Sequence, residues 1–227
     1  MTGRDANRGG CAQSCRWKYR LYEKERPLHD EQDLFSMSSK DLMAARFIPD
    51  LIQAGIASLK IEGRMKSAYY IATLIKTYRL LIDEVYEKGN LSEERLLWYY
   101  QELAKAENRP TAIGFYEGQP LPQAQLYGVN GAGVTQEFIA YVLAYDADTQ
   151  IATLEVRNNF KPFIEAEVFG PHITTTRFTF AELYDKDGKA MEVAKTPMQI
   201  ITAKVPCVME KDAMIRKVMK KDRSAIY

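Results

Sequence analysis

Several features that would define the class of protein at once are scarce in this sequence of 227 residues. Three cysteines are too few for a disulfide framework, so a reducing, cytoplasmic location is expected. No run of about 18 apolar residues is present, and the first twenty residues lack the apolar segment of a signal peptide, so no membrane association is expected. Basic and acidic residues number 31 and 30, which excludes a protein-wide basic field for nucleic acid but not local basic patches.

Common hydrolase motifs are missing as well. No zinc-binding H-E-x-x-H sequence occurs, and no pair of nucleophile and base is legible. The two histidines, His29 and His172, lie in a charged loop and after a Gly-Pro pair, where surface positions are expected. The residues alone therefore give little support to a protease.

The composition is that of a globular protein, with 46% apolar and 27% charged residues, and it is sufficient for a core. Changes in composition and residue pattern along the chain predict five regions. These are an arginine-rich cysteine segment (1–33), an α/β region (34–107), a linker rich in proline and glycine (108–125), a small β-barrel domain (126–205) and a basic tail (206–227).

The α/β region opens with alternating signals for strand and helix. Short strands are predicted at 34–37 and 57–61. Between them, the segment 38–41 fits a helix capping box, and a helix is predicted with Pro49 in its first turn and Gly55 at its end.

Two further helices follow in the same region. A long helix is predicted over 66–87, because its apolar residues recur every three or four positions, and another over 92–106, with Ser92 as the N-cap. Strand–helix–strand–helix order implies parallel pairing through a right-handed crossover. Two strands cannot make a parallel sheet that is covered on both faces. This region is therefore expected to pair with another polypeptide, or to lack its beginning.

The region 126–205 predicts an all-β domain. Asp187-Gly188 is a favourable hairpin turn, and short strands at this spacing suggest a small barrel. A short basic helix is expected at 211–221. The predicted strands are 138–143, 151–156, 164–169, 177–184 and 199–205.

Cys11 and Cys15 form a C-x3-C pair whose thiolates can reach one metal ion. The neighbouring Arg8 and Arg16 favour the thiolate forms. A stable site needs about four ligands, and the chain offers no convincing further two. A pair of free or buried thiols is the alternative interpretation.

A second group of candidate residues follows the strand predicted at 57–61. Lys60 and Glu62 share a face and can hold an anionic substrate or position a proton, or they form a structural ion pair. Tyr69 and Tyr70 can stack on a base or lie in the core.

Three strings in this sequence strongly resemble signatures of the U32 peptidase family, the collagenase-like proteases, and look most like members associated with tRNA uridine hydroxylation. The resemblance covers nearly the whole chain. The strings are GRDANRGGCAQSCRWKY (3–19), SLKIEGRMKSAYY (58–70) and RPTAIGFY (109–116).

The resemblance implies an incomplete TIM-type barrel, consisting of its last βα units, followed by a small C-terminal β-barrel domain. It implies a 4Fe–4S iron–sulfur cluster in the full-length protein, with Cys11 and Cys15 as two of four ligands, and prephenate as cosubstrate. The other ligands belong to sequence upstream, so a missing N-terminal half or partner subunit is expected, and catalytic residues stay unassigned. Residues expected to bind tRNA or cosubstrate are Arg4, Arg8, Arg16, Lys60, Glu62, Arg64, Lys66, Tyr69 and Tyr70.

Three functions follow from these observations. The first is part of an enzyme that hydroxylates the wobble uridine of tRNA. The second is a collagenase-like protease, as the family name states. The third is a noncatalytic fragment whose β-barrel binds a partner, because activity of this chain without an N-terminal half is not implied.

Overall fold

The computed structural model describes residues 3–5, 8, 10–28, 30, 34–63, 66–106, 109–126 and 137–218. The chain divides into two compact units, one within residues 1–134 and the other within residues 135–222. In the described part of the chain, no helix has the length and apolarity needed to cross a membrane.

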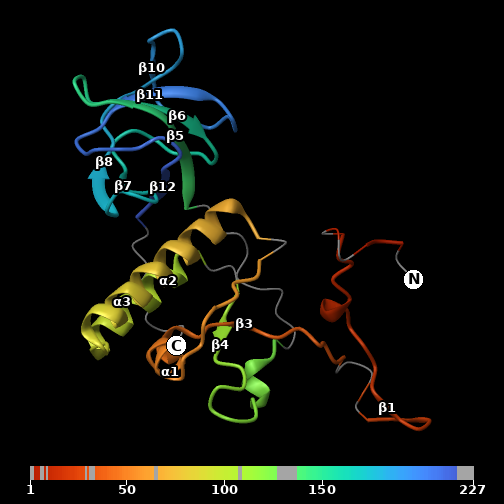
Figure 1. The fold of residues 1–227 in the computed structure, drawn as a ribbon. Helices are drawn as coiled ribbons and strands as arrows, with labels where there is room; N and C mark the ends of the chain where they lie inside the picture. The colour runs from red at the N-terminus through yellow and green to blue at the C-terminus, as the bar shows by residue number, and fades with distance from the viewer. Residues whose placement is uncertain are drawn as a thin grey trace. The chain divides into compact units, whose positions relative to one another are not determined.

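The first unit, called the α/β unit below, contains three α-helices in its described part, joined by long irregular segments (Figure 1). Two of its strand pairs are very short: β1 and β2 form an antiparallel hairpin, and β3 and β4 pair in parallel. Its elements are η2 (Ser14–Arg16), β1 (Tyr22–Glu23), β2 (Arg26–Pro27), β3 (Asp41–Leu42), η3 (Ala45–Phe47), α1 (Ile48–Gln53), α2 (Ala68–Lys88), α3 (Glu93–Ala104), β4 (Thr111–Ala112) and η4 (Pro122–Ala124).

Local signals for helix ends are confirmed. Pro49 lies in the first turn of α1, where its missing N–H is not needed. Gly55 follows the helix with a φ of 74°, and the N–H groups of Gly55 and Ile56 donate to the carbonyls of Ile52 and Leu51. This double bond pattern is a Schellman motif, which favours glycine at the left-handed position.

Helices α2 and α3 form a helical hairpin with a shared apolar core. Ser92 caps α3 as predicted, since its hydroxyl accepts the Arg95 N–H at 3.2 Å. Gly89 ends α2 with a φ of 75°. The buried residues of this core, from the two helices and from the segment before them, are Met43, Ala45, Ile48, Leu81, Val85, Tyr99 and Leu103.

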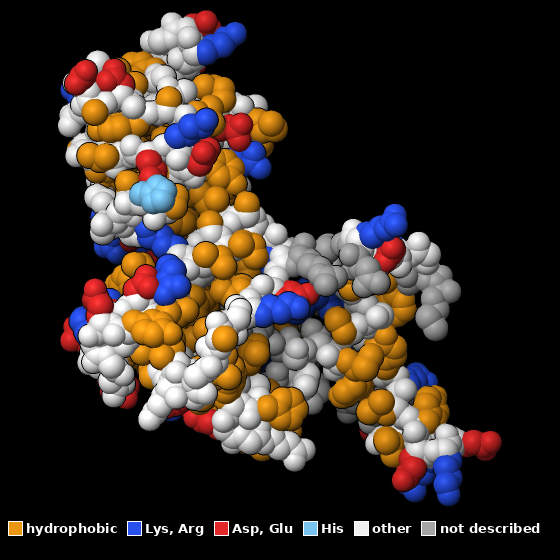
Figure 2. Space-filling model, in the orientation of Figure 1, with side chains coloured by type: hydrophobic (Ala, Val, Ile, Leu, Met, Phe, Trp, Pro, Cys, Tyr) orange, Lys and Arg blue, Asp and Glu red, His pale blue; other side chains and the backbone are white. Residues whose placement is uncertain are grey.

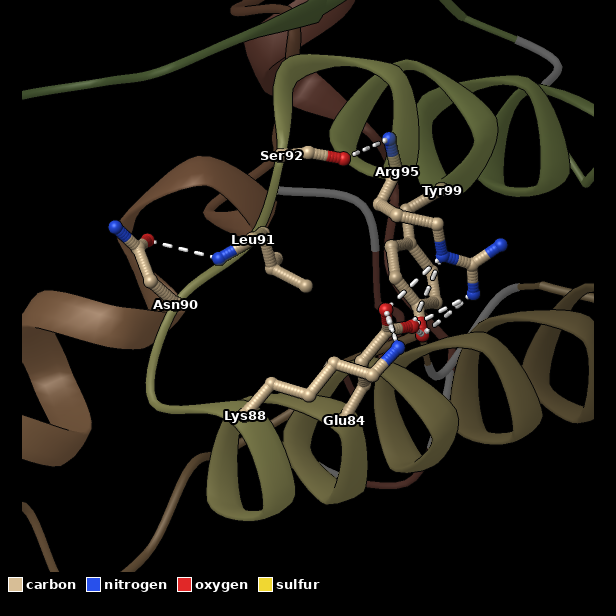
Figure 3. Close-up of polar contacts among 7 residues, drawn as sticks. All are labelled: Glu84, Lys88, Asn90, Leu91, Ser92, Arg95 and Tyr99. Atoms are coloured by element: carbon tan, nitrogen blue, oxygen red, sulfur yellow. Dashed lines mark hydrogen bonds and ion pairs between the residues drawn. The ribbon is translucent and has the colours of Figure 1, made fainter.

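A buried carboxylate joins the two helices. The Glu84 Oε2 accepts hydrogen bonds from Arg95 Nη2 at 2.6 Å and from the Tyr99 hydroxyl at 2.7 Å, and Lys88 Nζ lies 2.9 Å from Oε1 (Figure 3). The hydrogen bond from Arg95 lowers the pKa of Glu84 from 4.5 to about 2, with smaller contributions from Lys88 and Tyr99. The ionised carboxylate therefore stabilises the hairpin across neutral pH.

The strands predicted at 34–37 and 57–61 are absent, and both predictions were wrong. Residue 35 forms only an isolated bridge with Tyr19, and 57–61 has no strand. The capping box expected at 38–41 is also wrong, because Asp41 begins β3, which pairs with β4 inside the expected linker. A strand forms only where a neighbouring strand satisfies its backbone groups. The described residues thus contain a two-stranded parallel pair, and they do not show a TIM-type barrel.

The second unit, called the β unit, confirms the all-β prediction. Its eight strands pair antiparallel in the order β10-β9-β11-β6-β5-β12-β7-β8, in a curled sheet (Figure 1). Among the described residues, the edge strands β10 and β8 do not pair with each other, so the sheet is an open half-barrel. The strands are β5 (Phe138–Asp146), β6 (Ile151–Val156), β7 (Glu165–Phe169), β8 (Thr176–Thr179), β9 (Leu183–Tyr184), β10 (Ala190–Met191), β11 (Ile200–Lys204) and β12 (Met214–Lys217).

Alternation along the strands places one face of this sheet in the core. In β6, the side chains of Ala152, Leu154 and Val156 are fully buried and the residues between them are not. The predicted turn at Asp187-Gly188 is confirmed, since it joins β9 to β10 and Gly188 has a φ of 76°.

The basic helix predicted at 211–221 was wrong. Met214–Lys217 is strand β12, which fits between β5 and β7. Arg216 is only 2% exposed, and its guanidinium forms an ion pair with Glu167 at 2.8 Å. The positive charges of this segment suggested a solvated tail, but non-local pairing buries one of them against a carboxylate of β7.

Candidate functional site

Asp41 lies at the centre of a polar cluster in the α/β unit. Its Oδ2 accepts hydrogen bonds from Lys66 Nζ at 2.6 Å and from the Tyr70 hydroxyl at 3.4 Å, and its Oδ1 lies 3.7 Å from Arg109 Nη1. The charged side chains of Asp41, Lys66 and Arg109 are all largely buried. Lys66 Nζ also lies 4.5 Å from the centroid of the Tyr70 ring, a cation–π distance.

Local structure explains why these residues meet. Ser67 caps α2, with its hydroxyl accepting the Tyr70 N–H at 3.1 Å, so Lys66 immediately precedes the cap and Tyr70 lies in the first turn of the helix. The parallel pair β3–β4 sets Asp41 opposite Thr111. Arg109 precedes Thr111 by two residues and is thereby brought to the same carboxylate.

A cavity of about 540 Å³ adjoins this cluster. Asp41, Lys66 and Tyr70 line it together with apolar side chains of α1 and α2. Three basic and two acidic residues line the cavity, so its lining has one positive charge in excess: Lys60, Lys66, Arg79, Asp41 and Glu62. The cavity is therefore suited to an organic anion that also has an apolar body.

Tyr78 adds a hydrogen-bonding group to the same cavity. Its hydroxyl oxygen accepts the Ala44 N–H at 3.2 Å. Burial raises the pKa of Tyr78 to about 12, so the phenol stays neutral. Its O–H can therefore donate to a ligand.

The structure distributes the predicted substrate residues unevenly. Lys66 and Tyr70 belong to the Asp41 cluster. Lys60 and Glu62 line the same cavity, where they form an exposed ion pair at 3.6 Å. Tyr69 instead is buried, and its hydroxyl donates to the Lys105 carbonyl at 3.1 Å, as a core tyrosine does. Arg64 lies outside the described residues.

The arginine-rich segment forms a separate part of the α/β unit. Arg4, Arg8 and Arg16 are exposed, and Arg8 pairs with Asp5 at 3.4 Å. Cys15 is exposed on η2, and the backbone carbonyl of Cys15 accepts the Ser36 hydroxyl at 3.3 Å. The assignment of these three arginines to the binding of tRNA or cosubstrate stays a prediction.

Cys11 and Cys15 are the candidate ligands of the expected iron–sulfur cluster. The Cys11 Sγ accepts the Gln13 N–H at 3.3 Å. Within the described residues, no group of three or more His, Cys, Asp or Glu is placed to hold a metal ion. Cys207 belongs to the β unit, and burial raises its pKa. Two cysteines supply at most half of the four ligands that such a cluster needs, so the assignment of Cys11 and Cys15 to a cluster stays a prediction.

Three residues of the site were not predicted from the sequence: Asp41, Tyr78 and Arg109. Asp41 was assigned to a helix cap, and Tyr78 only to the apolar face of a helix. Arg109 occurs in the third family string, but nothing local connects it with residue 41. The pairing of β3 with β4 brings Asp41 and Arg109 together, and local sequence patterns do not reveal this pairing.

The chain is thus a two-part protein, in which an α/β unit with a charged cavity and a parallel strand pair is followed by an antiparallel β unit. Residues 1–126 match the model of peptidase family U32, and residues 134–216 match that of the peptidase family U32 C-terminal domain. The chain belongs to peptidase family U32, which confirms the resemblance.

Individual relatives carry different names. tRNA hydroxylation protein P1 of Bacillus subtilis is 43% identical over 222 residues, covering 96% of this chain and 52% of that protein. A collagenase of Porphyromonas gingivalis is 34% identical over 67% of this chain and 37% of its own length. The crystal structure of the C-terminal domain of a Geobacillus thermoleovorans U32 peptidase has 38% identity and a TM-score of 0.37, covering 38% of this chain and 97% of that one. The chain thus spans about half the length of the first relative, and less of the second.

Proposed function

We propose that this chain is the C-terminal part of a cytoplasmic iron–sulfur enzyme that hydroxylates the wobble uridine of tRNA in a prephenate-dependent reaction. The observation that carries the proposal is the 43% identity with the Bacillus subtilis tRNA hydroxylation protein, because it extends over both units. The Asp41 cavity is consistent with it, since its excess positive charge suits an anionic cosubstrate or an RNA phosphate.

In this proposal, the cations of the cavity hold the anion. Lys66, which lines the cavity, binds its negative group, and Asp41 holds Lys66 in place. Arg109, which does not line the cavity, pairs with the other oxygen of Asp41. Tyr78 donates a hydrogen bond from inside the cavity. Lys60, Glu62 and Arg64, together with the arginines of the N-terminal segment, extend the surface that contacts tRNA.

We further propose that the α/β unit is the last part of an α/β barrel that an N-terminal half completes. Most large hydrophobic side chains that are exposed lie in this unit, where orange side chains reach the surface (Figure 2). They include Leu42, Leu59 and Leu121. Such patches on a folded protein mark surfaces that another segment covers. The same half would supply two more cysteines to Cys11 and Cys15.

The test uses a bacterial strain that lacks wobble hydroxylation. The strain receives the chain alone or the chain joined to the N-terminal half of the Bacillus subtilis relative, and hydroxyuridine in tRNA is measured by mass spectrometry. We expect hydroxyuridine only with the joined protein. It should disappear in the C11S/C15S variant and persist in the matched control C207S.

Two results would contradict the proposal. Full hydroxylation by the C11S/C15S variant would remove the cluster role. Binding of tRNA without hydroxylation, even by the joined protein, would favour a noncatalytic binding fragment.

Collagenase-like activity is the second candidate, because of the Porphyromonas gingivalis relative. The Asp41 cluster contains no serine, cysteine or histidine nucleophile, so it supports this function less. Purified joined protein should leave gelatin and casein intact. Hydrolysis abolished by a single substitution in this chain would reverse the ranking.

A further inference from the structure

The two ends of the half-barrel in the β unit carry opposite charge. Because β6 and β11 run antiparallel, the segment before β6 lies at the same end as the segment after β11. These two segments, 146–150 and 205–213, hold four acidic residues and one lysine. The segments at the other end, 157–164 and 194–199, hold three basic residues and no acidic one. The positive charge is thus separated to the end where β6 stops and β11 begins.

Two lysines lie side by side in the structure of this basic end. An antiparallel bridge between Phe160 and Ala194 joins the two basic segments, and both bridge residues are buried. Lys161 and Lys195 directly follow them, so alternation turns both lysine side chains away from the core. Both are exposed.

Lys217 brings a third ammonium group to the same place. It ends β12, and its Nζ lies 3.4 Å from the Oδ1 of Asn159, the residue before the bridge. Glu165 and Glu192 lie next to the basic segments in the chain, yet in the ranges that the structure describes no carboxylate forms an ion pair with any of the three lysines. Grouped charges of one sign repel, so an anion that joins them is stabilising. The group, called the lysine cluster below, consists of Lys161, Lys195 and Lys217.

An exposed aromatic residue follows the lysine in the first basic segment. Phe163 is 69% exposed, and its φ of 64° lies in the left-handed region that favours glycine. Met198 repeats both features in the second segment, with 66% exposure and a φ of 65°. Backbone strain and exposure to water both disfavour a large apolar side chain at these positions, and such positions are typical of binding surfaces.

We infer that the lysine cluster binds neighbouring phosphates of the tRNA backbone and that Phe163 stacks on a nearby base. Lysines that neutralise phosphates, together with exposed aromatic rings, are the usual elements of RNA binding that does not depend on sequence. An apolar protein surface would match Phe163 and Met198 but would leave three ammonium groups without counter-charge. The inference rests on the proposed function, whose substrate is a polyanion, and the identity with the tRNA hydroxylation protein extends through the β unit.

The experiment measures binding of the full chain to an unmodified tRNA transcript by fluorescence anisotropy at several salt concentrations. Each phosphate contact contributes about 0.9 to the slope of log affinity against log salt. The variant K161Q/K195Q/K217Q should therefore lower this slope by about 2.7, and its affinity should fall about 40-fold less than that of the unaltered chain between about 50 and 200 mM salt. The double variant K161Q/K195Q leaves the partly buried Lys217 in place and should lower the slope by about 1.8.

The matched control removes three exposed lysines from other parts of the β unit. K186Q/K189Q/K204Q changes the net charge by the same amount and should keep the slope of the unaltered chain. A slope that falls equally in the control and in the lysine-cluster variant overturns the inference, as does an unchanged slope in both lysine-cluster variants.

Phe163→Gly tests the stacked base without a cost to the fold. Glycine accepts the φ of 64°, so the melting temperature should stay unchanged or rise. Binding should weaken roughly five-fold or more at every salt concentration, since one stacked base contributes at least about 1 kcal/mol. The control is Gln150→Gly, at a φ of 57° at the acidic end, which should bind like the unaltered chain. Normal binding by Phe163→Gly overturns the stacking of a base on this ring.

A protein surface is the competing occupant, and the same variants distinguish it. The inference is overturned if the lysine-cluster variant binds tRNA normally but loses association with the N-terminal half of the Bacillus subtilis relative, or if the unaltered chain does not bind tRNA. The proposed function is decided separately, by hydroxyuridine formation with the joined protein, so either can fail while the other stands.

Discussion

Glu84 provides a stability prediction whose size follows from the structure. Glu84→Gln keeps the shape of the side chain but removes the negative charge of the carboxylate that accepts hydrogen bonds from Arg95, Lys88 and Tyr99. The lowering of the pKa of Glu84 from 4.5 to about 2 corresponds to about 3 kcal/mol. Arg95 is 40% exposed, so solvent screens part of this interaction, and we expect a loss of about 2 kcal/mol in the free energy of unfolding.

The lowered pKa also predicts the direction in which the stability contributed by Glu84 changes with pH. Because the pKa of Glu84 is lower in the folded chain, its contribution is present above pH 4.5 and is lost as the pH falls towards about 2. The difference between the unaltered chain and Glu84→Gln should therefore be largest near neutral pH and shrink in acid. Urea unfolding followed by helical circular dichroism reports on it, since the helices of the described chain all lie in the α/β unit.

Asp83 supplies the matched control on the same helix. It pairs with Arg79 at 2.5 Å, but both side chains are more than half exposed. Asp83→Asn should therefore change stability by less than about 0.5 kcal/mol. Equal losses in the two variants, or a Glu84→Gln loss of the same size at every pH, would refute the reasoning.

Two largely buried ion pairs allow comparable tests, and an exposed pair serves as the control for the first. Lys66→Met removes the closest cation of Asp41, which is largely buried, and should lower the free energy of unfolding in urea by about 1–3 kcal/mol. Lys60→Met, at an exposed pair, should lower it by less than about 0.5 kcal/mol. Equal effects of the two substitutions would show that burial of the first pair is unimportant. Glu167→Gln leaves the buried Arg216 without its carboxylate and should cost about 3–5 kcal/mol, seen as faster hydrogen exchange in the β unit. An added Arg216→Met should restore part of that loss, and no restoration would count against the pair as the cause.

Local chemistry made parts of this fold predictable. Pro49 and Gly55 mark the ends of α1, and Ser92 begins α3, because caps and turns act within a few residues. The short apolar runs at 138–143 and 151–156 likewise predicted β5 and β6. These elements depend on backbone preferences and on one buried face, which the order of residues specifies directly.

Other parts were not readable because they depend on distant segments. The alternation at 57–61 resembles a strand, yet no strand forms there without neighbours. The positive charges around Arg216 resemble a solvated helix, yet β5 and β7 enclose this segment as a strand. In both cases the pattern was ambiguous, and non-local hydrogen bonding selected the outcome.

By itself, the sequence predicted α1, α2 and α3, the ends of α1, the start of α3, the all-β character of the second unit and the membership in family U32. Only the tertiary structure brought Asp41, Lys66 and Arg109 together beside a cavity. The physical reason is range: periodicity and capping act within a helix turn or a strand, whereas this site is created by backbone hydrogen bonds between β3 and β4, whose residues lie far apart in the chain.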